Sequence, residues 1–198
     1  MQNNLERINP DLVVEDEILG QKTLEFHLER YRFAEKHLSA GLVADIACGV
    51  GYGSFLLAKE CSDHIKHLYA IDNDAESIRF ATRRYAHPKI TFTEGDAMHY
   101  QAPGKLNTIV SLETLEHLED PAGFIQHMAK QLASGGRFIA SVPITPSMDA
   151  NPYHLHDFTI KGFKKMFTDV GMYEIDSIIQ QQPYSIFSIM KKEEERSK

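Results

Sequence analysis

The sequence predicts an α/β fold, in which a doubly wound, mostly parallel sheet of seven strands is covered by helices on both faces. Short apolar runs alternate along the chain with segments of helical periodicity, which is typical of parallel sheets connected by helices. Several of these runs end in glycine or acidic residues, where such sheets bind ligands. No repeat, linker or low-complexity tract divides the 198 residues, so we expect a single domain over residues 1–198.

Seven apolar runs, bounded by polar or turn-forming residues, predict the strands of this sheet. In chain order they cover residues 42–47, 67–71, 90–93, 107–112, 136–142, 172–181 and 184–190. A Gln-Pro turn separates the last two runs and indicates a closing hairpin. We therefore expect this C-terminal hairpin to add an antiparallel strand near one edge of the sheet.

Five segments with apolar residues at helical spacing predict the helices. They cover residues 21–38, 53–61, 74–85, 121–132 and 158–170. Asp74 is well placed as the N-cap of the third helix, and Pro121 opens the fourth. An irregular polar arm precedes the first helix, and residues 191–198 form a solvated tail.

The composition favours a small molecule over a polynucleotide as the partner. The formal net charge is −7, and no basic run is longer than a pair, whereas nucleic-acid binders carry a basic face. No apolar stretch approaches the ~20 residues that cross a bilayer, and the first residues lack the pattern of a secretory signal. We expect a cytoplasmic protein that does not bind membranes; a homodimer is compatible with the sequence but not indicated by it.

A glycine-rich turn follows the first predicted strand in the segment DIACGVGYG. Gly49, Gly51 and Gly53 let the backbone approach a ligand, and the helix that follows favours a negatively charged group at its N-terminus. Asp72 closes the second strand, where a carboxylate can accept hydrogen bonds from both hydroxyls of a ribose. The spacing G-x-G-x-G differs from the G-x-G-x-x-G of dinucleotide sites. Together these residues predict a nucleoside-binding site.

The chain resembles the class I S-adenosylmethionine-dependent methyltransferases in four segments that span about residues 25–170. These are VADIACGVGYG, LYAIDNDAESIRFA, ITFTEGDAMHY, and NTIVSLETLEHLEDP followed by LASGGRFIASVP. The resemblance implies a Rossmann-like fold, S-adenosylmethionine as the cofactor, and methyl transfer to an acceptor. Within the family, the chain is most similar to the small-molecule O-methyltransferases.

The resemblance also implies which residues bind the methionine part of the cofactor. In the family the glycine loop holds this part, so Asp45, Cys48, Gly49 and Gly51 take that role. The end of the fourth strand, residues 111–113 with Leu112 among them, would line the floor beneath the sulfonium.

The adenosine part is expected at the ends of the second and third strands. The resemblance implies that Asp72 binds the ribose and that Asn73 lies beside the adenine. Asp96 would contact the adenine amino group, and Ala97 would supply a backbone donor. Loop capping is the structural alternative for both aspartates.

The first predicted helix carries residues that could close over this site. His27 and Tyr31 are four residues apart and share a helix face, so both are predicted to bind the cofactor. Arg30 could meet the cofactor carboxylate. Similar arms act as lids in the family, so residues 1–40 are interpreted as an arm and lid helix; an ordinary packing helix is the alternative.

A hydroxyl acceptor is a poor nucleophile until it loses its proton, which calls for a general base or a metal ion. In a helical turn after the fourth strand, Glu113, Glu116 and His117 would share one face. His154 and His156, two residues apart, could add a further ligand. This set suits Mg²⁺ or Mn²⁺ and, as further alternatives, Fe²⁺ or Zn²⁺.

The pattern E-x-x-E-H resembles the metal site of small-RNA 3′-terminal 2′-O-methyltransferases and that of ubiquinone-pathway O-methyltransferases. His117 and Glu113 are therefore the predicted catalytic residues. A metal-free catalytic histidine and a packing histidine remain alternatives.

The leading hypothesis is O-methylation of a small hydroxylated metabolite. A small-RNA 2′-O-methyltransferase shares the proposed chemistry but conflicts with the acidic charge. A nicotinamide-dependent oxidoreductase fits the alternating pattern but not the glycine spacing. A non-catalytic domain that binds the cofactor only to support a partner protein is the alternative of another class.

Overall fold

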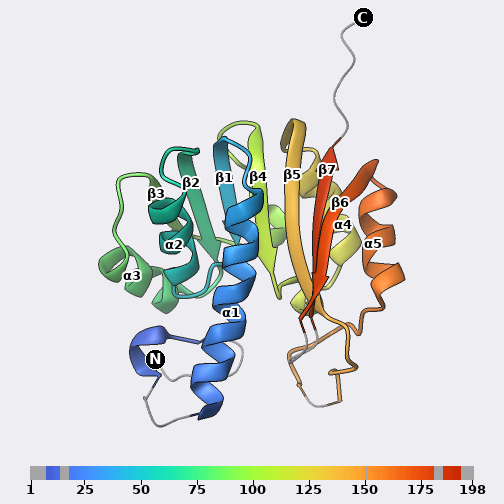
Figure 1. Ribbon diagram of the computed structural model, residues 1–198, viewed down its shortest axis with the longest axis horizontal. Coiled ribbons are helices and arrows are strands. Elements are labelled where there is room, and N and C mark those ends of the chain that lie inside the picture. The colour runs from blue at the N-terminus through green and yellow to red at the C-terminus, as the bar shows by residue number, and fades with distance from the viewer. Residues whose placement is uncertain (1–7, 14–17, 150, 181–184, 193–198) are drawn as a thin grey trace, which may run out of the picture.

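The computed structural model describes residues 8–13, 18–149, 151–180 and 185–192, and it contains a seven-stranded sheet between two layers of helices (Figure 1). The strand order is β3-β2-β1-β4-β5-β7-β6, and β7 runs antiparallel to both of its neighbours, β5 and β6. The predicted α/β fold with a C-terminal antiparallel hairpin is confirmed. The strands are β1 Gly41–Ile46, β2 Ile65–Asp72, β3 Ile90–Glu94, β4 Leu106–Leu112, β5 Leu132–Pro143, β6 Met172–Ile179 and β7 Ser185–Lys192.

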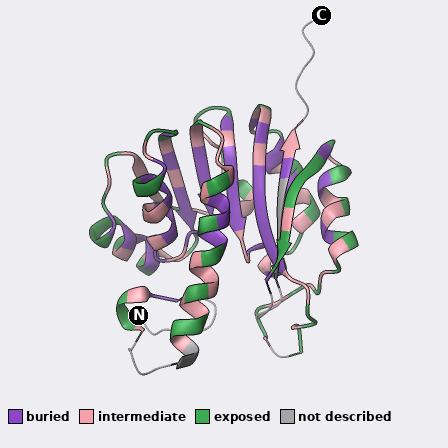
Figure 2. Ribbon diagram, viewed as in Figure 1, coloured by how far each residue is buried: buried purple, intermediate pink, exposed green. Residues whose placement is uncertain are grey.

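Helices cover both faces of the sheet because residues along its central strands alternate between two apolar cores. Val43 and Val110 pack in the core beneath α1 Ile18–His37, α2 Tyr52–Glu60 and α3 Ala75–Arg84. Ala44 and Ile109, the neighbouring positions, pack in the other core beneath α4 Pro121–Ala129 and α5 Ile160–Thr168. The central strands are accordingly buried along most of their length (Figure 2). None of the described helices is both long and apolar enough to cross a membrane.

The helix starts follow the predicted capping signals. Asp74 accepts a hydrogen bond from the backbone N–H of Ser77 at 3.0 Å, as expected for the N-cap of α3. Pro121 is the first residue of α4, where Asp120 is the N-cap. Short 3₁₀ helices lie in the N-terminal arm (η1 Pro10–Leu12), after β3 (η2 Ala97–His99) and after β4 (η3 Leu115–His117). The last of these is the helical turn predicted after the fourth strand.

Several element boundaries differ from the sequence prediction, among them those of α4, β5 and β7. The predicted fourth helix ran to residue 132, but α4 ends at Ala129, and Leu132 already pairs with Leu106 of β4. Leu132 is fully buried, so its apolar side chain continued the helical pattern although its backbone belongs to the sheet. At the other end, β7 extends through Lys192, two residues into the predicted tail. The rest of that tail and the predicted Gln-Pro turn lie outside the described residues.

The strand register brings the ends of the central strands together at one edge of the sheet. Ile46 of β1 is level with Ile71 of β2 and with Ser111 of β4. Leu112 of β4 is level with Ser141 of β5. The residues that follow these strands therefore meet at the edge where doubly wound sheets bind ligands.

Candidate active site

A cavity of about 480 Å³ opens at this edge, a size typical of small-molecule sites. All the predicted cofactor residues except Asp45 and Gly51 line it, together with Glu113 and His117. The lining cofactor residues are His27, Tyr31, Cys48, Gly49, Asp72, Asn73, Asp96, Ala97 and Leu112. They come from α1 and from the connections after four strands, so the fold brings together side chains that are far apart in the sequence.

The glycine-rich turn needs left-handed backbone at three positions. Ala47, Gly49 and Gly51 have φ values of 60°, 56° and 84°. A Cβ at Gly49 would meet no atom within 4 Å, so this glycine leaves space on the cavity side. A Cβ at Gly51 would come within 2.6 Å of the Phe92 ring. The turn thus needs glycine at position 49 for the backbone conformation, and at position 51 for both the backbone conformation and the packing.

Asp45 lies behind the turn, and it is not among the residues that line the cavity. Its buried Oδ2 accepts hydrogen bonds from the Ser54 hydroxyl at 2.6 Å and from the Tyr31 hydroxyl at 3.3 Å. Burial raises the pKa of the Asp45 carboxyl to about 7, and these two hydrogen bonds oppose the rise. Asp45 therefore links the arm helix to the start of α2.

The third glycine of the motif has a role that the sequence did not reveal. A Cβ at Gly53 would overlap the ring of Tyr31, so only glycine lets α1 pack this closely on α2. The contact joins positions 22 residues apart, and the spacing of the glycines alone gives no sign of the partner. Gly53 explains why the motif reads G-x-G-x-G although no ligand contact requires its last glycine.

Asp72 holds the glycine turn through a hydrogen bond and also lines the cavity. Its Oδ2 accepts the N–H of Gly49 at 2.8 Å, and its Oδ1 accepts the N–H of Asp74 at 2.9 Å. Each carboxylate oxygen has a second lone pair that can accept a further hydrogen bond. Loop capping and ligand binding are therefore compatible at this residue.

Asp96 is the N-cap of η2 and also lines the cavity. It accepts the N–H of Met98 at 2.9 Å, and its other carboxylate oxygen accepts a hydrogen bond from Nδ1 of His99 at 2.7 Å. The hydrogen bond from His99 lowers the pKa of the Asp96 carboxyl. No sequence pattern connects His99 with this site.

The N-terminal arm contributes to the cavity wall through both of its described parts. Ile8 is buried and lines the cavity, and Asp11 of η1 forms two hydrogen bonds with the Arg84 side chain of α3, at 2.7 and 3.2 Å. From α1, Arg30 also lines the cavity with a side chain that is only 3% exposed. The predicted arm therefore borders the site, whereas its action as a lid stays a prediction.

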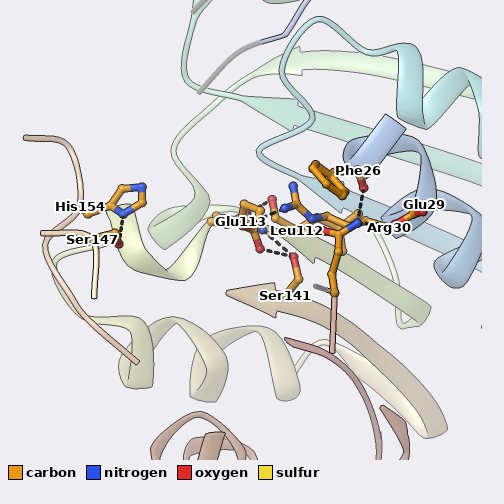
Figure 3. Close-up of polar contacts among 10 residues, drawn as sticks. Phe26, Glu29, Arg30, Leu112, Glu113, Ser141, Ser147 and His154 are labelled. Atoms are coloured by element: carbon orange, nitrogen blue, oxygen red, sulfur yellow. Dashed lines mark hydrogen bonds and ion pairs between the residues drawn. The ribbon is translucent and has the colours of Figure 1, made fainter. Parts of the chain in front are cut away.

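Glu113 is held by α1 on one side and by β5 on the other (Figure 3). Its Oε2 lies 3.2 Å from a guanidinium nitrogen of Arg30, and its Oε1 accepts the Ser141 hydroxyl at 2.7 Å. The backbone N–H of Glu113 donates to Ser141 as well, and its φ of 50° is unusual for a residue other than glycine. Such a conformation persists where surrounding contacts fix it, often at functional sites.

The structure brings together three of the five predicted metal ligands. Ligand atoms of Glu116, His117 and His154 lie within 4.8 Å of one another, and Glu116 is buried. Glu113 is not part of this group, because its carboxylate engages Arg30 and Ser141. His156 is also outside the group.

Hydrogen bonds orient all three histidines of this region. Nδ1 of His117 donates to the carbonyl oxygen of Tyr153 at 3.0 Å, which leaves Nε2 as the acceptor of the neutral ring. Nδ1 of His154 lies 2.7 Å from the Ser147 hydroxyl (Figure 3). His156 instead donates from Nε2 to the Leu118 carbonyl at 2.8 Å and anchors the backbone.

Comparisons with known proteins agree with this fold and cavity. A family model described as a methyltransferase domain matches residues 43–136. A probable S-adenosylmethionine-dependent methyltransferase of Mycobacterium tuberculosis is 24% identical over 177 residues, which cover 86% of this chain and 61% of that protein. Phosphoethanolamine N-methyltransferase 1 of Arabidopsis thaliana is 26% identical over 167 residues, which cover 78% of this chain and 33% of that protein.

The fold is also similar to that of solved structures. N-methyltransferase NodS of Bradyrhizobium japonicum, solved with S-adenosylhomocysteine, superposes with a TM-score of 0.72 at 21% identity, covering 95% of this chain and 96% of NodS. Fold, cavity and comparisons agree with a methyltransferase domain over residues 43–136. The chain is similar in sequence to probable S-adenosylmethionine-dependent methyltransferases. It spans about three fifths of the length of the mycobacterial relative.

Proposed function

We propose that this chain transfers the methyl group of S-adenosylmethionine to a hydroxyl group of a small molecule. The observation that carries the proposal is that His117 lines the same cavity as the cofactor-binding residues. The cofactor supplies both the electrophilic carbon and the leaving group, so the protein must align the acceptor and receive its proton. The O–CH₃ bond forms as the S–CH₃ bond breaks, and S-adenosylhomocysteine leaves.

We assign the ribose to Asp72 and the adenine to the wall formed by Asn73 and Asp96, because these residues line the cavity at the ends of the neighbouring strands β2 and β3. The methionine carboxylate is assigned to the side with Gly49 and Arg30, where α2 also begins. The N-terminus of a helix and a guanidinium group both favour a negative charge there.

His117 is the proposed proton acceptor. Because Nδ1 donates to the Tyr153 carbonyl, the neutral ring presents Nε2 with its lone pair. Histidine is the side chain that most often serves as a general base in enzymes. The hydrogen bond to Tyr153 also holds the ring in one orientation, which a general base requires.

A divalent cation held by Glu116, His117 and His154 is the second candidate, and the proximity of their ligand atoms favours it. A histidine that binds a metal commonly donates its other N–H to a carbonyl, as His117 does to Tyr153. Two imidazoles and one carboxylate suit Mn²⁺, Fe²⁺ or Zn²⁺ better than Mg²⁺, which prefers oxygen ligands. When bound, such a cation would lower the pKa of the acceptor hydroxyl by coordinating its oxygen.

The test is a transfer assay with radiolabelled S-adenosylmethionine over a panel of hydroxyl compounds and matched amines. His117→Ala is expected to lower transfer by about 10²–10⁴-fold, while the affinity for S-adenosylhomocysteine stays within about threefold. His64→Ala, at an exposed position, is the matched control and should leave transfer unchanged. Full activity in His117→Ala would contradict the assignment, and transfer to amines alone would contradict the hydroxyl acceptor.

A chelator separates the two candidates for hydroxyl activation. Activity that disappears with a strong chelator and returns with Mn²⁺ or Zn²⁺ would support the cation, and Glu116→Gln should then also be inactive. Activity that a chelator leaves unchanged would support His117 as the base. A 3′-terminal RNA oligonucleotide belongs in the same panel, because RNA remains the alternative acceptor; the net charge of −7 argues against it.

A further inference from the structure

Three exposed apolar side chains lie on the segment between β5 and α5, and one of them, Tyr153, lines the cavity. Met148, Tyr153 and Leu155 are 45%, 67% and 44% exposed, and we call these three side chains the acceptor platform. The segment that carries them follows the carboxyl end of β5 (Figure 1). Exposed apolar side chains at the border of a cavity are typical of ligand-binding grooves.

Hydrogen bonds fix the backbone of this segment, so the platform is held in place. The Asp157 carboxylate accepts the N–H groups of Ser147 and Met148 at 2.7 and 3.2 Å. The N–H of Leu155 donates to the carbonyl of Glu116 at 2.7 Å. The segment is therefore attached directly to η3, the turn that carries His117.

Tyr153 connects the platform to the proposed chemistry. It lines the cavity, and its carbonyl oxygen accepts the hydrogen bond that orients His117. Leu118, the residue after His117, also lines the cavity and adds apolar surface. An acceptor whose hydroxyl reaches His117 therefore enters a cavity that Tyr153 and Leu118 also line.

We propose that the acceptor is a phenol whose aromatic ring lies against the acceptor platform, rather than a sugar or another polyol. This inference rests on the proposed methyl transfer to oxygen. Tyrosine rings favour stacked or edge-on contacts with other aromatic rings, and apolar neighbours favour a ligand with little hydration to lose. A polyol would instead need several hydrogen-bonding partners, which a methionine and a leucine side chain do not offer.

The acidity of the hydroxyl supports the same class of acceptor. A phenol has a pKa of about 10, as the tyrosine side chain shows, whereas water has about 15.7 and aliphatic alcohols resemble it. Loss of the hydroxyl proton is therefore far less unfavourable from a phenol. In the step, the phenol oxygen bonds to the methyl carbon as the S–CH₃ bond breaks, and the electron pair of that bond goes to sulfur. The phenol proton goes to solvent through the group that activates the hydroxyl under the proposed function.

The test measures binding of 1-naphthol and myo-inositol to the protein loaded with S-adenosylhomocysteine, so that no turnover occurs. We expect 1-naphthol to bind to saturation and myo-inositol not to bind. Tyr153→Ala should weaken 1-naphthol binding by about tenfold, and Tyr153→Phe should keep it within about twofold. Ile179→Ser is the matched control, because Ile179 is 54% exposed on β6 and does not line the cavity.

The inference is overturned if myo-inositol binds as tightly as 1-naphthol, if Tyr153→Ala binds 1-naphthol as the wild type does, or if Ile179→Ser weakens binding equally. The methylation kinetics give an independent readout, in which Tyr153→Ala raises KM for 1-naphthol while kcat stays within about threefold. A wild-type protein that does not bind S-adenosylhomocysteine would overturn the proposed function itself. One that binds it and ignores 1-naphthol would overturn the phenol inference alone.

Discussion

Replacing Asp45 by asparagine should remove a pH-dependent loss of stability that arises from the buried carboxyl of this residue in β1. The carboxyl group is 1% exposed, and both of its hydrogen-bond donors, Ser54 and Tyr31, bind the same oxygen, Oδ2. An asparagine amide oxygen can accept both hydrogen bonds, so Asp45→Asn keeps the contacts and removes only the ionisation.

The magnitude follows from the raised pKa of Asp45. Its ordinary value is 3.8 and burial raises it to about 7, so between these values the folded state binds more protons than the unfolded state. The free energy of unfolding therefore falls as pH rises, by about 1.4 kcal/mol per pH unit and about 4 kcal/mol in total. Between pH 5 and pH 7 the loss is about 2 kcal/mol, and above pH 7 it levels off.

The assay is urea unfolding of the wild type and of Asp45→Asn at pH 5, 6, 7 and 8. The difference in unfolding free energy should shift in favour of Asp45→Asn by about 2 kcal/mol from pH 5 to pH 7. Asp63→Asn, at an exposed position, is the control and should give a curve parallel to that of the wild type. A parallel curve for Asp45→Asn would refute the argument that Asp45 carries a raised pKa.

Two further predictions concern packing and capping. Gly53→Ala should lower stability by about 1–3 kcal/mol and weaken binding of S-adenosylhomocysteine, because the new Cβ displaces the Tyr31 ring. Gly104→Ala is the control, because a Cβ at Gly104 would have its nearest contact at 3.4 Å. Equal losses in the two variants would contradict this explanation. Asp74→Ala should lower the free energy of unfolding by about 1 kcal/mol, because it removes the N-cap of α3. This loss corresponds to a fall in Tm of about 2–4 °C. An unchanged melting curve would show that the cap contributes nothing.

The sequence predicted the succession of strands and helices along the chain because the central strands are continuous apolar runs bounded by glycine or acidic residues. Most of the candidate cofactor residues that it predicted line the cavity, since the ends of parallel strands meet at one edge of the sheet. Leu132 shows the limit of such patterns: a buried leucine at helical spacing looks the same at the end of a helix and at the start of a strand.

The side chains that α1 and the segment after β5 bring to the cavity were harder to predict. Glu113 shares a helical spacing with Glu116, but its backbone takes a left-handed conformation and its carboxylate pairs with Arg30, 83 residues earlier. Similarly, nothing in the spacing of His154 and His156 indicates that the first joins Glu116 while the second anchors a loop. These outcomes depend on long-range contacts that local patterns do not encode.

Calorimetric titration with S-adenosylhomocysteine tests the central claim most directly. The wild type should bind one molecule per chain, and Asp72→Ala should weaken binding by at least about tenfold through loss of the ribose contacts. A wild-type protein that gives no binding signal at saturating S-adenosylhomocysteine would contradict the assignment of the cavity to the cofactor.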